Sequence, residues 1–221
     1  MSGAHAFFIT IEGIEGAGKS TQAGLLARAM RRAGGSCLET REPGGGAGRV
    51  GPALRDLLRD PTVWRELGLA EIYLYAAARA HHVESVIRPA LDRGCHVVCD
   101  RFLDSTRAYQ GAGRGRDPGL IEALHRLPPL DLRPHRTILL DLDPRDGLAR
   151  AAARPGRPRG YDEEDVAFFR RVREGFLRIA EREPSRVCVV DASPPAREVH
   201  EAVVGAVRDL FPGIAPLDRV E

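Results

Sequence analysis

Five short runs divide the chain, and each has the composition of a β-strand. Most are rich in Val, Ile, Leu or Phe, are apolar at nearly every position, and end at a polar residue. The runs cover residues 7–12, 36–40, 96–100, 137–141 and 186–191. Strands that do not alternate apolar with polar residues are typical of parallel sheets with both faces covered.

The segments between these runs repeat their apolar residues with helical spacing. The predicted helices cover residues 19–32, 53–59, 65–92 with a break near Gly68, 105–110, 120–126, 146–154, 163–182 and 196–211. Glycine- and proline-rich stretches predict loops at residues 41–46, 111–119, 127–134 and 154–160. Strands that alternate with helices predict an α/β fold: a five-stranded parallel sheet with helices on both faces. Because ligands bind outside the carboxyl ends of such strands, the loops after Glu12, Thr40 and Asp100 are expected to converge on one crevice.

Composition narrows the class of protein. With 221 residues, 43% hydrophobic and 29% charged, the chain is typical of one globular domain. A net charge of +2 argues against nucleic acid as a partner. The longest apolar runs fall far short of the ~20 residues that a membrane helix needs, and the N-terminus lacks the basic start of a secretory signal. The four cysteines form no CxxC pair, so we expect buried, reduced thiols and a cytoplasmic protein.

The clearest chemical motif follows the first predicted strand. Residues 13–20 read GIEGAGKS and fit the phosphate-binding pattern G-x-x-x-x-G-K-[ST] between a strand and a helix. In this motif, backbone N–H groups surround phosphate oxygens, the lysine reaches the β and γ phosphates, and the hydroxyl ligates Mg²⁺. We therefore assign ATP binding to Gly13, Ile14, Glu15, Gly16, Ala17, Gly18, Lys19, Ser20 and Thr21. Lys19 is the only lysine among 33 basic residues, which indicates a position that needs a compact ammonium group.

Two further groups place charge near the expected crevice. Asp100 and Arg101 end the third predicted strand, where the carboxylate suits Mg²⁺ and the guanidinium suits a phosphate. The basic loop RPGRPRG carries Arg154, Arg157 and Arg159, which could neutralise a transferring phosphoryl group if the loop closes as a lid. A structural ion pair and a solvated surface loop remain the alternative interpretations of these two features.

Residues suited to an acceptor surround the same crevice. Tyr75 and Arg79 are spaced i, i+4 on a predicted helix and could stack on a base and hydrogen-bond it, although a place at the core edge and surface fits this spacing too. The other candidates follow the second and third predicted strands, and they are Arg41, Pro43, Ser105, Thr106, Tyr109 and Gln110.

With these motifs in this order, the chain resembles the bacterial thymidylate kinases over almost its whole length. The resemblance rests on FITIEGIEGAGKSTQ at residues 8–22, TREPGG at 40–45, AAARAHHVESVIRPAL at 76–91, DRFLDSTRAYQG at 100–111 and the late basic loop. It implies a P-loop nucleoside-monophosphate-kinase fold, a homodimer, Mg²⁺ as cofactor, and transfer of the ATP γ-phosphate to dTMP. It also implies a single domain over residues 1–221, with a mobile lid at about 154–163 and a short tail at about 212–221.

The resemblance implies roles for the catalytic side chains. Lys19 and Arg101 would neutralise charge in the transition state, and Arg101 would hold the acceptor phosphate together with the Arg41 loop. Glu15 would contact the sugar 3′-hydroxyl. Gly16 stands where the eukaryotic-type enzymes carry a P-loop arginine, so the lid would supply a catalytic arginine instead.

The resemblance also implies how the base and sugar are recognised. Arg79 and Thr106 would contact the edge of thymine, and Tyr109 would lie where a 2′-hydroxyl would clash. Tyr75 stands where the family usually has the phenylalanine that stacks on thymine.

The function predicted from the sequence is therefore an ATP:dTMP phosphotransferase. Two alternatives stay open at this point. One is another nucleotide or nucleoside kinase of the same fold, and the other is a non-catalytic P-loop module that senses a nucleotide. The chain contains no asparagine, so it lacks the Asn-Lys-x-Asp element of GTPases.

Overall fold

The computed structural model describes residues 6–60, 63, 66–153 and 165–217, and these contain one five-stranded sheet. The strands are β1 (Phe8–Gly13), β2 (Cys37–Arg41), β3 (His96–Asp100), β4 (Arg136–Asp141) and β5 (Val187–Asp191). Their order is β2-β3-β1-β4-β5, and every neighbouring pair is parallel. The five predicted strands are confirmed, and no end is displaced by more than one residue.

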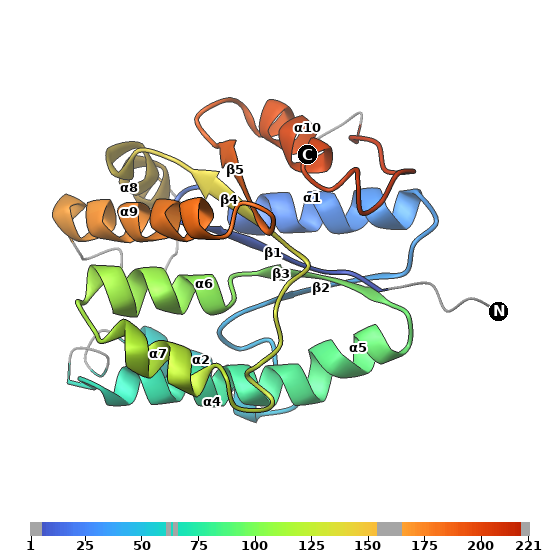
Figure 1. Ribbon diagram of the computed structural model, residues 1–221. Coiled ribbons are helices and arrows are strands. Elements are labelled where there is room, and N and C mark those ends of the chain that lie inside the picture. The colour runs from blue at the N-terminus through green and yellow to red at the C-terminus, as the bar shows by residue number, and fades with distance from the viewer. Residues whose placement is uncertain (1–5, 61–62, 64–65, 154–164, 218–221) are drawn as a thin grey trace.

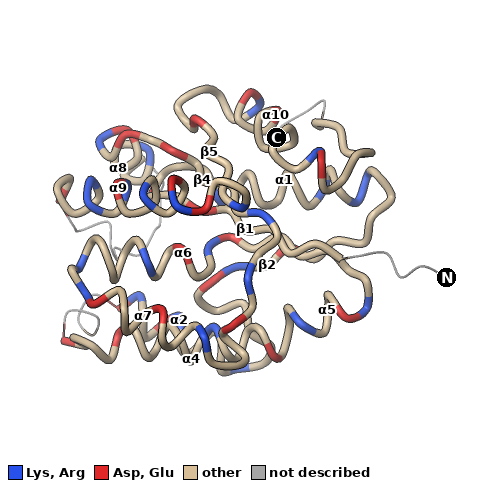
Figure 2. The backbone as a smooth tube through the Cα atoms, in the orientation of Figure 1, with Lys and Arg blue, Asp and Glu red and all other residues tan. Residues whose placement is uncertain are grey.

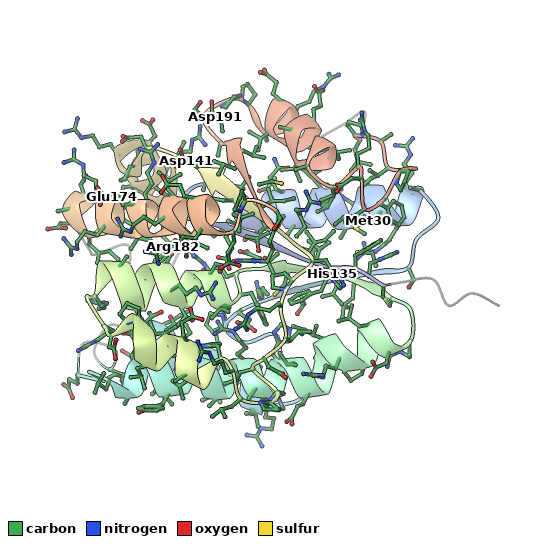
Figure 3. The ribbon with its side chains drawn as sticks, viewed as in Figure 1. Met30, His135, Asp141, Glu174, Arg182 and Asp191 are labelled. Carbon is green, nitrogen blue, oxygen red and sulfur yellow. The ribbon has the colours of Figure 1, made fainter. Side chains whose placement is uncertain are left out.

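The register brings the carboxyl ends of three strands to one level. Asp100 of β3 pairs with Ile11 of β1 and with Arg41 of β2, so the loops after these strands start side by side. Asp141 and Asp191 end β4 and β5. His135 precedes the start of β4 and so lies at the opposite, amino-terminal end of the strands (Figure 3). The expected crevice therefore lies at the carboxyl edge, where ligands bind in open α/β sheets.

Helices cover both faces of the sheet, with α1 and α10 on one side and α4 and α5 on the other (Figure 1). Their bounds are α1 (Lys19–Arg32), α2 (Val50–Arg59), α4 (Ala70–His82), α5 (Arg88–Asp92), α6 (Leu103–Thr106), α7 (Pro118–Leu124), α8 (Pro144–Ala152), α9 (Val166–Arg182) and α10 (Ala196–Gly205). Two π-helical segments, η1 (Val83–Ile87) and η2 (Arg107–Gly113), join α4 to α5 and extend α6. α2 packs on α4, and α9 packs on η2 and α8.

The alternation of side chains along β1 and β3 creates two apolar clusters. Ile9, Ile11 and Val98 belong to a cluster with residues of α1, α10 and α9. Phe8 and Val97 belong to a second cluster with residues of α4, η1 and α5. β1 and β3 are buried on both faces, so neither strand alternates apolar residues with solvent-exposed polar ones.

Most predicted helices differ from the structure at one or both ends, and three segments show the kinds of difference. The predicted loop at 111–119 begins in η2, which continues to Gly113, because glycines there allow close packing: a Cβ on Gly113 would lie 2.7 Å from Phe168, and one on Gly175 would lie 2.6 Å from Ala112. The predicted helix at 65–92 is α4, η1 and α5, starting at Ala70. The helix predicted at 196–211 ends at Gly205 and continues as tight turns, with hydrogen bonds such as Val207 N–H to Val204 O.

The four cysteines differ in how deeply they are buried. All four cysteines are unpaired, but only Cys37 and Cys99 are buried; Cys95 and Cys188 are half-buried, so the prediction of four buried thiols is wrong for two of them.

Acidic and basic residues are interspersed over the elements (Figure 2). Among the residues that the structure describes, no helix has both the length and the apolar character needed to cross a membrane.

Candidate active site

The loop between β1 and α1 is wound as a phosphate cradle. Gly13, Gly16 and Gly18 have φ values of 143°, 75° and 89°, a region that favours glycine. Gly18 is the N-cap of α1, so the loop leads directly into the positive end of the helix. The loop therefore has the glycine-dependent backbone conformation that its spacing predicts.

Lys19 closes this loop from inside. Its Nζ donates to the Ile14 carbonyl at 2.6 Å and lies 3.9 Å from a Glu15 carboxylate oxygen, and the side chain is 8% exposed. Burial, together with the nearby Arg101 charge, lowers the pKa of Lys19 to about 8. The compact ammonium group predicted from its being the only lysine is thus buried beneath the cradle.

Ser20 and Asp100 meet at the mouth of the cradle. The Ser20 hydroxyl donates to Asp100 Oδ2 at 2.5 Å. Asp100 Oδ1 is buried and has no hydrogen-bond partner among the described residues. Two adjacent oxygen ligands, one of them an orphaned carboxylate oxygen, fit Mg²⁺, which binds few protein oxygens and takes the rest from phosphates and water.

Arg101 directly follows Asp100 and is held in an unusual backbone conformation. Its φ is +71°, and it is the only non-glycine residue with positive φ in the described part of the chain. Its Nη1 donates to the Gly13 carbonyl and to Ser105 Oγ, each at 3.1 Å, and its Nη2 donates to Glu15 and, at 3.1 Å, to the Tyr109 hydroxyl. Burial alone would lower the pKa of Arg101, but Glu15 and its other acidic neighbours raise it well above its usual value.

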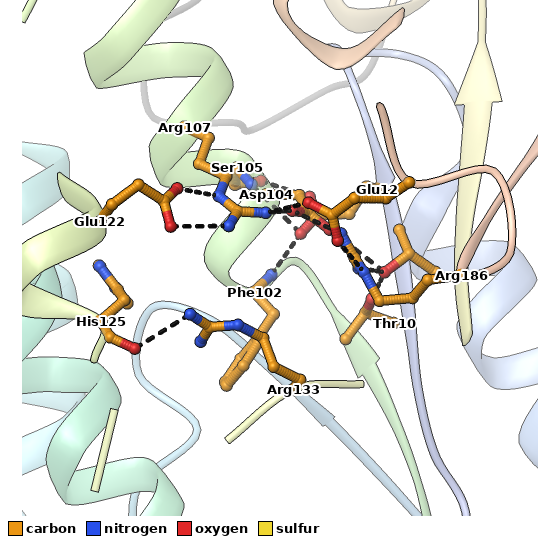
Figure 4. Close-up of polar contacts among 12 residues, drawn as sticks. Thr10, Glu12, Phe102, Asp104, Ser105, Arg107, Glu122, His125, Arg133 and Arg186 are labelled. Carbon is orange, nitrogen blue, oxygen red and sulfur yellow. Dashed lines mark hydrogen bonds and ion pairs between the residues drawn. The ribbon is translucent and has the colours of Figure 1, made fainter. Parts of the chain in front are cut away.

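Glu12 supports this arrangement from below. Its Oε1 accepts from the backbone N–H groups of Phe102 (2.7 Å) and Ser105 (3.2 Å), and its Oε2 accepts from the Ser105 hydroxyl at 2.6 Å (Figure 4). Burial, followed by the charge of Asp104, raises the pKa of Glu12 to about 8. Because Ser105 also contacts Arg101, Glu12 fixes the start of α6 relative to the cradle.

A second layer of ion pairs anchors α6 and η2 (Figure 4). Asp104 accepts from Arg186 and Arg107, and Arg107 also pairs with Glu122 and Glu183. Desolvation would raise the pKa of Asp104, but the adjacent Arg186 and Arg107 lower it. The segment that carries the acceptor candidates is therefore held at a fixed position over β1 and β4.

The end of the crevice away from the P-loop is formed by α4 and η2. Arg79 is 1% exposed, with Nε 2.8 Å from Glu42 Oε2 and Nη2 3.1 Å from Thr106 Oγ1. The Tyr109 hydroxyl donates to Glu15 Oε2 at 2.8 Å, and its ring packs edge-on against aromatic residues of α9. Gln110 donates to a Glu71 oxygen at 3.2 Å. Arg79 thus lies in the site rather than on the protein surface.

A cavity of about 160 Å³ joins the cradle to this end of the crevice. Most of the predicted site residues line it: Glu15, Gly16, Gly18, Lys19, Ser20, Arg41, Pro43, Tyr75, Arg79, Asp100, Arg101, Ser105, Thr106, Tyr109 and Gln110. Gly13, Ile14, Ala17 and Thr21 belong to the same loop and helix but do not line the cavity. Arg154, Arg157, Arg159 and the rest of the expected lid to residue 163 lie outside the described residues.

Sequence reasoning missed several residues that shape the cavity. Arg55 and Arg59 of α2 line it beside Arg41, and Arg55 Nη1 donates to the Pro43 carbonyl at 2.7 Å. Burial, then repulsion by Arg59 and Arg41, lowers the pKa of Arg55 to about 10. The i, i+4 spacing of Arg55 and Arg59 on one helix face was a usable signal. Glu42 and Phe102 also line the cavity; both lie within the motifs TREPGG and DRFLDSTRAYQG, but neither was assigned a role there.

The fold and this cavity define a class of protein. A P-loop cradle for a nucleoside triphosphate opens into the same cavity as a second, arginine-lined pocket, which is the arrangement of a nucleoside monophosphate kinase, an ATP-dependent phosphotransferase.

Comparison with known proteins identifies the family. The family model described as thymidylate kinase matches residues 11–203. The chain is 48% identical over 206 residues to the thymidylate kinase of Thermomicrobium roseum, covering 93% of this chain and 96% of that protein, and 47% identical over 202 residues to that of Deinococcus radiodurans, covering 91% and 96%. The crystal structure of thymidylate kinase from Ehrlichia chaffeensis matches with a TM-score of 0.72 at 34% identity, covering 92% of this chain and 98% of that one. The chain belongs to the thymidylate kinase family.

Proposed function

We propose that this protein transfers the γ-phosphate of ATP to dTMP and so produces dTDP for dTTP synthesis. The observation that carries the proposal is the single cavity in which the P-loop lysine, Lys19, and the acceptor-side arginines, Arg41 and Arg101, face the same space. One end of this cavity suits a triphosphate, and the other end suits a phosphomonoester attached to a sugar and a base.

The chemistry needs positioning and charge neutralisation rather than a general base. The acceptor phosphate is already anionic near pH 7 and is its own nucleophile, so catalysis consists of alignment and electrostatic stabilisation. The P-loop backbone and Lys19 hold the donor phosphates. Arg101 holds the acceptor phosphate, and its bonds to Glu15 and Tyr109 fix its direction. Ser20 and Asp100 would hold Mg²⁺, which would supply charge neutralisation at the donor phosphates.

The remaining site residues divide between the two substrates. Glu15 and Tyr109 contact the sugar, and their mutual hydrogen bond places them on one side of the acceptor pocket. Tyr75 stacks on the base, while Arg79 and Thr106 donate to its edge. A lid arginine from Arg154, Arg157 or Arg159 completes the neutralisation of the transferred group.

The proposal also covers the oligomeric state, the cellular location and the domain organisation of the protein. Four of the exposed apolar residues lie on α2 and at the start of α4, two helices that pack on each other, and they are Val50, Leu57, Leu69 and Tyr73. Such a patch supports a homodimer in which a second copy covers it. Light scattering should give a dimer mass that Tyr73→Glu reduces to the monomer mass. Unpaired cysteines support a cytoplasmic location, and residues 1–221 act as one domain.

A comparison of acceptors tests the activity. ADP formation from ATP and Mg²⁺ is measured with dTMP, dUMP, dCMP, dGMP and thymidine at equal concentrations. The proposal predicts the highest kcat/KM with dTMP. A higher value with any other acceptor would assign the chain to another nucleotide kinase of the same fold, and no ADP with any acceptor would favour a nucleotide-sensing module.

A further inference from the structure

A buried histidine outside the recognised motifs holds the base-reading arginine. We propose that His125 is a positioning residue that orients the Arg79 guanidinium and thereby sets the affinity for a pyrimidine base with a carbonyl acceptor. This inference rests on the proposed function and adds to it a residue that does not line the cavity.

Arg79 is fixed by one partner on each of its three nitrogens. Nε donates to Glu42, Nη2 donates to Thr106, and Nη1 donates to His125 Nε2 at 2.6 Å. The guanidinium also lies over the Phe102 ring, 5.0 Å from its centre. A guanidinium has five N–H groups, so two remain without a partner among the described residues. Because Arg79 lines the cavity, these two are the donors available to a ligand carbonyl.

The bond from Arg79 requires one particular tautomer of His125. Its Nδ1 lies 2.7 Å from the Ile121 carbonyl, which can only accept, so Nδ1 carries the proton. In the neutral ring Nε2 is then an acceptor, which matches the donor Nη1 of Arg79. Burial, followed by the Arg79 charge, lowers the pKa of His125 to about 4, which keeps the ring neutral near pH 7.

His125 is itself anchored independently of Arg79. It caps the C-terminus of α7, and Arg133 Nη2 donates to its backbone carbonyl at 3.0 Å (Figure 4). The ring is fully buried. The imidazole is therefore a fixed acceptor that the substrate does not need to order.

Two substitutions separate the bond to Arg79 from the local bond to Ile121. A glutamine side-chain oxygen can reach the position of Nε2, whereas an asparagine amide reaches only that of Nδ1. His125→Gln therefore retains an acceptor for Arg79, and His125→Asn retains only the donor for Ile121. His125→Asn removes a hydrogen bond to a charged group, so it should raise the KM for dTMP about tenfold. We expect His125→Gln to stay within about threefold of wild type, because one acceptor replaces another.

The split between kinetic constants shows whether the effect passes through Arg79. Both variants should keep kcat and the KM for ATP within about twofold of wild type, since neither touches the cradle. In an Arg79→Lys background, His125→Asn should change the KM for dTMP by no more than about twofold. An unchanged dTMP KM in His125→Asn, an equal loss in both variants, or a full effect in the Arg79→Lys background would each overturn the proposal.

A measurement on the wild-type protein covers the case in which His125→Asn does not fold. The ¹⁵N spectrum of histidine-labelled protein near pH 7 should show His125 with its proton on Nδ1 and none on Nε2. A proton on Nε2 would overturn the proposal. A wild-type protein that does not phosphorylate dTMP would instead refute the proposed function, whatever the tautomer of His125.

Discussion

Gly147 of α8 packs backbone to backbone against Gly16 of the P-loop. A Cβ on Gly16 would lie 2.0 Å from the Gly147 carbonyl oxygen, and a Cβ on Gly147 would lie 2.4 Å from the Glu15 carbonyl oxygen. The helix that immediately precedes the basic segment from residue 154 is therefore seated on the phosphate cradle without a side chain between them. Any side chain at either glycine must displace the cradle.

Gly147→Ala should impair catalysis although alanine is the better helix former. The added methyl group pushes the Glu15 peptide out of place, and a misplacement of about 1 Å costs on the order of 100-fold in kcat. Steady-state kinetics with ATP and dTMP measure the loss. Gly205→Ala is the matched control, because a Cβ there meets nothing within 4 Å; it should keep wild-type kinetics. Equal activity in both variants would show that the contact with the cradle tolerates a side chain.

Lys19→Arg should lower kcat by about 100-fold or more while the protein stays folded. The ammonium group is 8% exposed and contacts the Ile14 carbonyl at 2.6 Å, so a larger planar group cannot occupy the same position. Turnover is measured beside a thermal unfolding curve. Lys19→Arg with wild-type turnover would contradict the steric explanation for the only lysine of the chain.

Replacing Arg154, Arg157 and Arg159 together by alanine tests the predicted lid. An arginine that stabilises the transferred phosphoryl group contributes about 1,000-fold to kcat in other phosphotransferases, and it contributes little to acceptor binding. We expect a fall in kcat of that order with a dTMP Kd within about threefold of wild type. Calorimetric titration with dTMP measures the Kd. If only dTMP affinity falls, these arginines belong to the acceptor pocket instead.

Acid pH should destabilise the amino-terminal end of the sheet, opposite the site, because it protonates His96. Its Nδ1 accepts from the Phe7 N–H at 3.0 Å, and burial lowers the pKa of His96. A lowered pKa means that the neutral ring stabilises the fold above about pH 6.5, and that this stabilisation is lost as the pH falls. His96→Asn keeps an acceptor for Phe7 but does not titrate. Urea unfolding at pH 7 and pH 5 should show a smaller loss of unfolding free energy in His96→Asn than in wild type; equal losses would contradict this role.

The sheet and the P-loop were predictable because their signals are local. A buried parallel strand is a short apolar run, and the cradle needs glycines at fixed spacing, so β3 and α1 match their predicted bounds. The loop predicted at 111–119 was wrong at its start, in η2, because a glycine that ends a helix and one that permits close helix packing cannot be told apart in the sequence. Gly113 serves the second purpose, against Phe168 of α9.

The acceptor end depends on contacts between distant elements, which a single sequence does not display. Arg79 lies 37 residues from Glu42 and 46 from His125 in the chain. The positive φ of Arg101 likewise follows from its bonds to Gly13, Glu15 and Tyr109 and not from its own residue type. Arg79 and Arg101 were candidates because of their motifs and spacing, whereas Glu42 and His125 were not candidates. Only the fold shows which partners orient the two arginines.

The fate of the γ-phosphate tests the central proposal most directly. The wild-type protein is incubated with ATP, Mg²⁺ and dTMP, and the products are followed by ³¹P NMR. Transfer within one cavity predicts that the β-phosphate signals of ADP and dTDP rise together in equal amounts while no inorganic phosphate accumulates. Inorganic phosphate appearing with ADP while dTMP stays unchanged would contradict it.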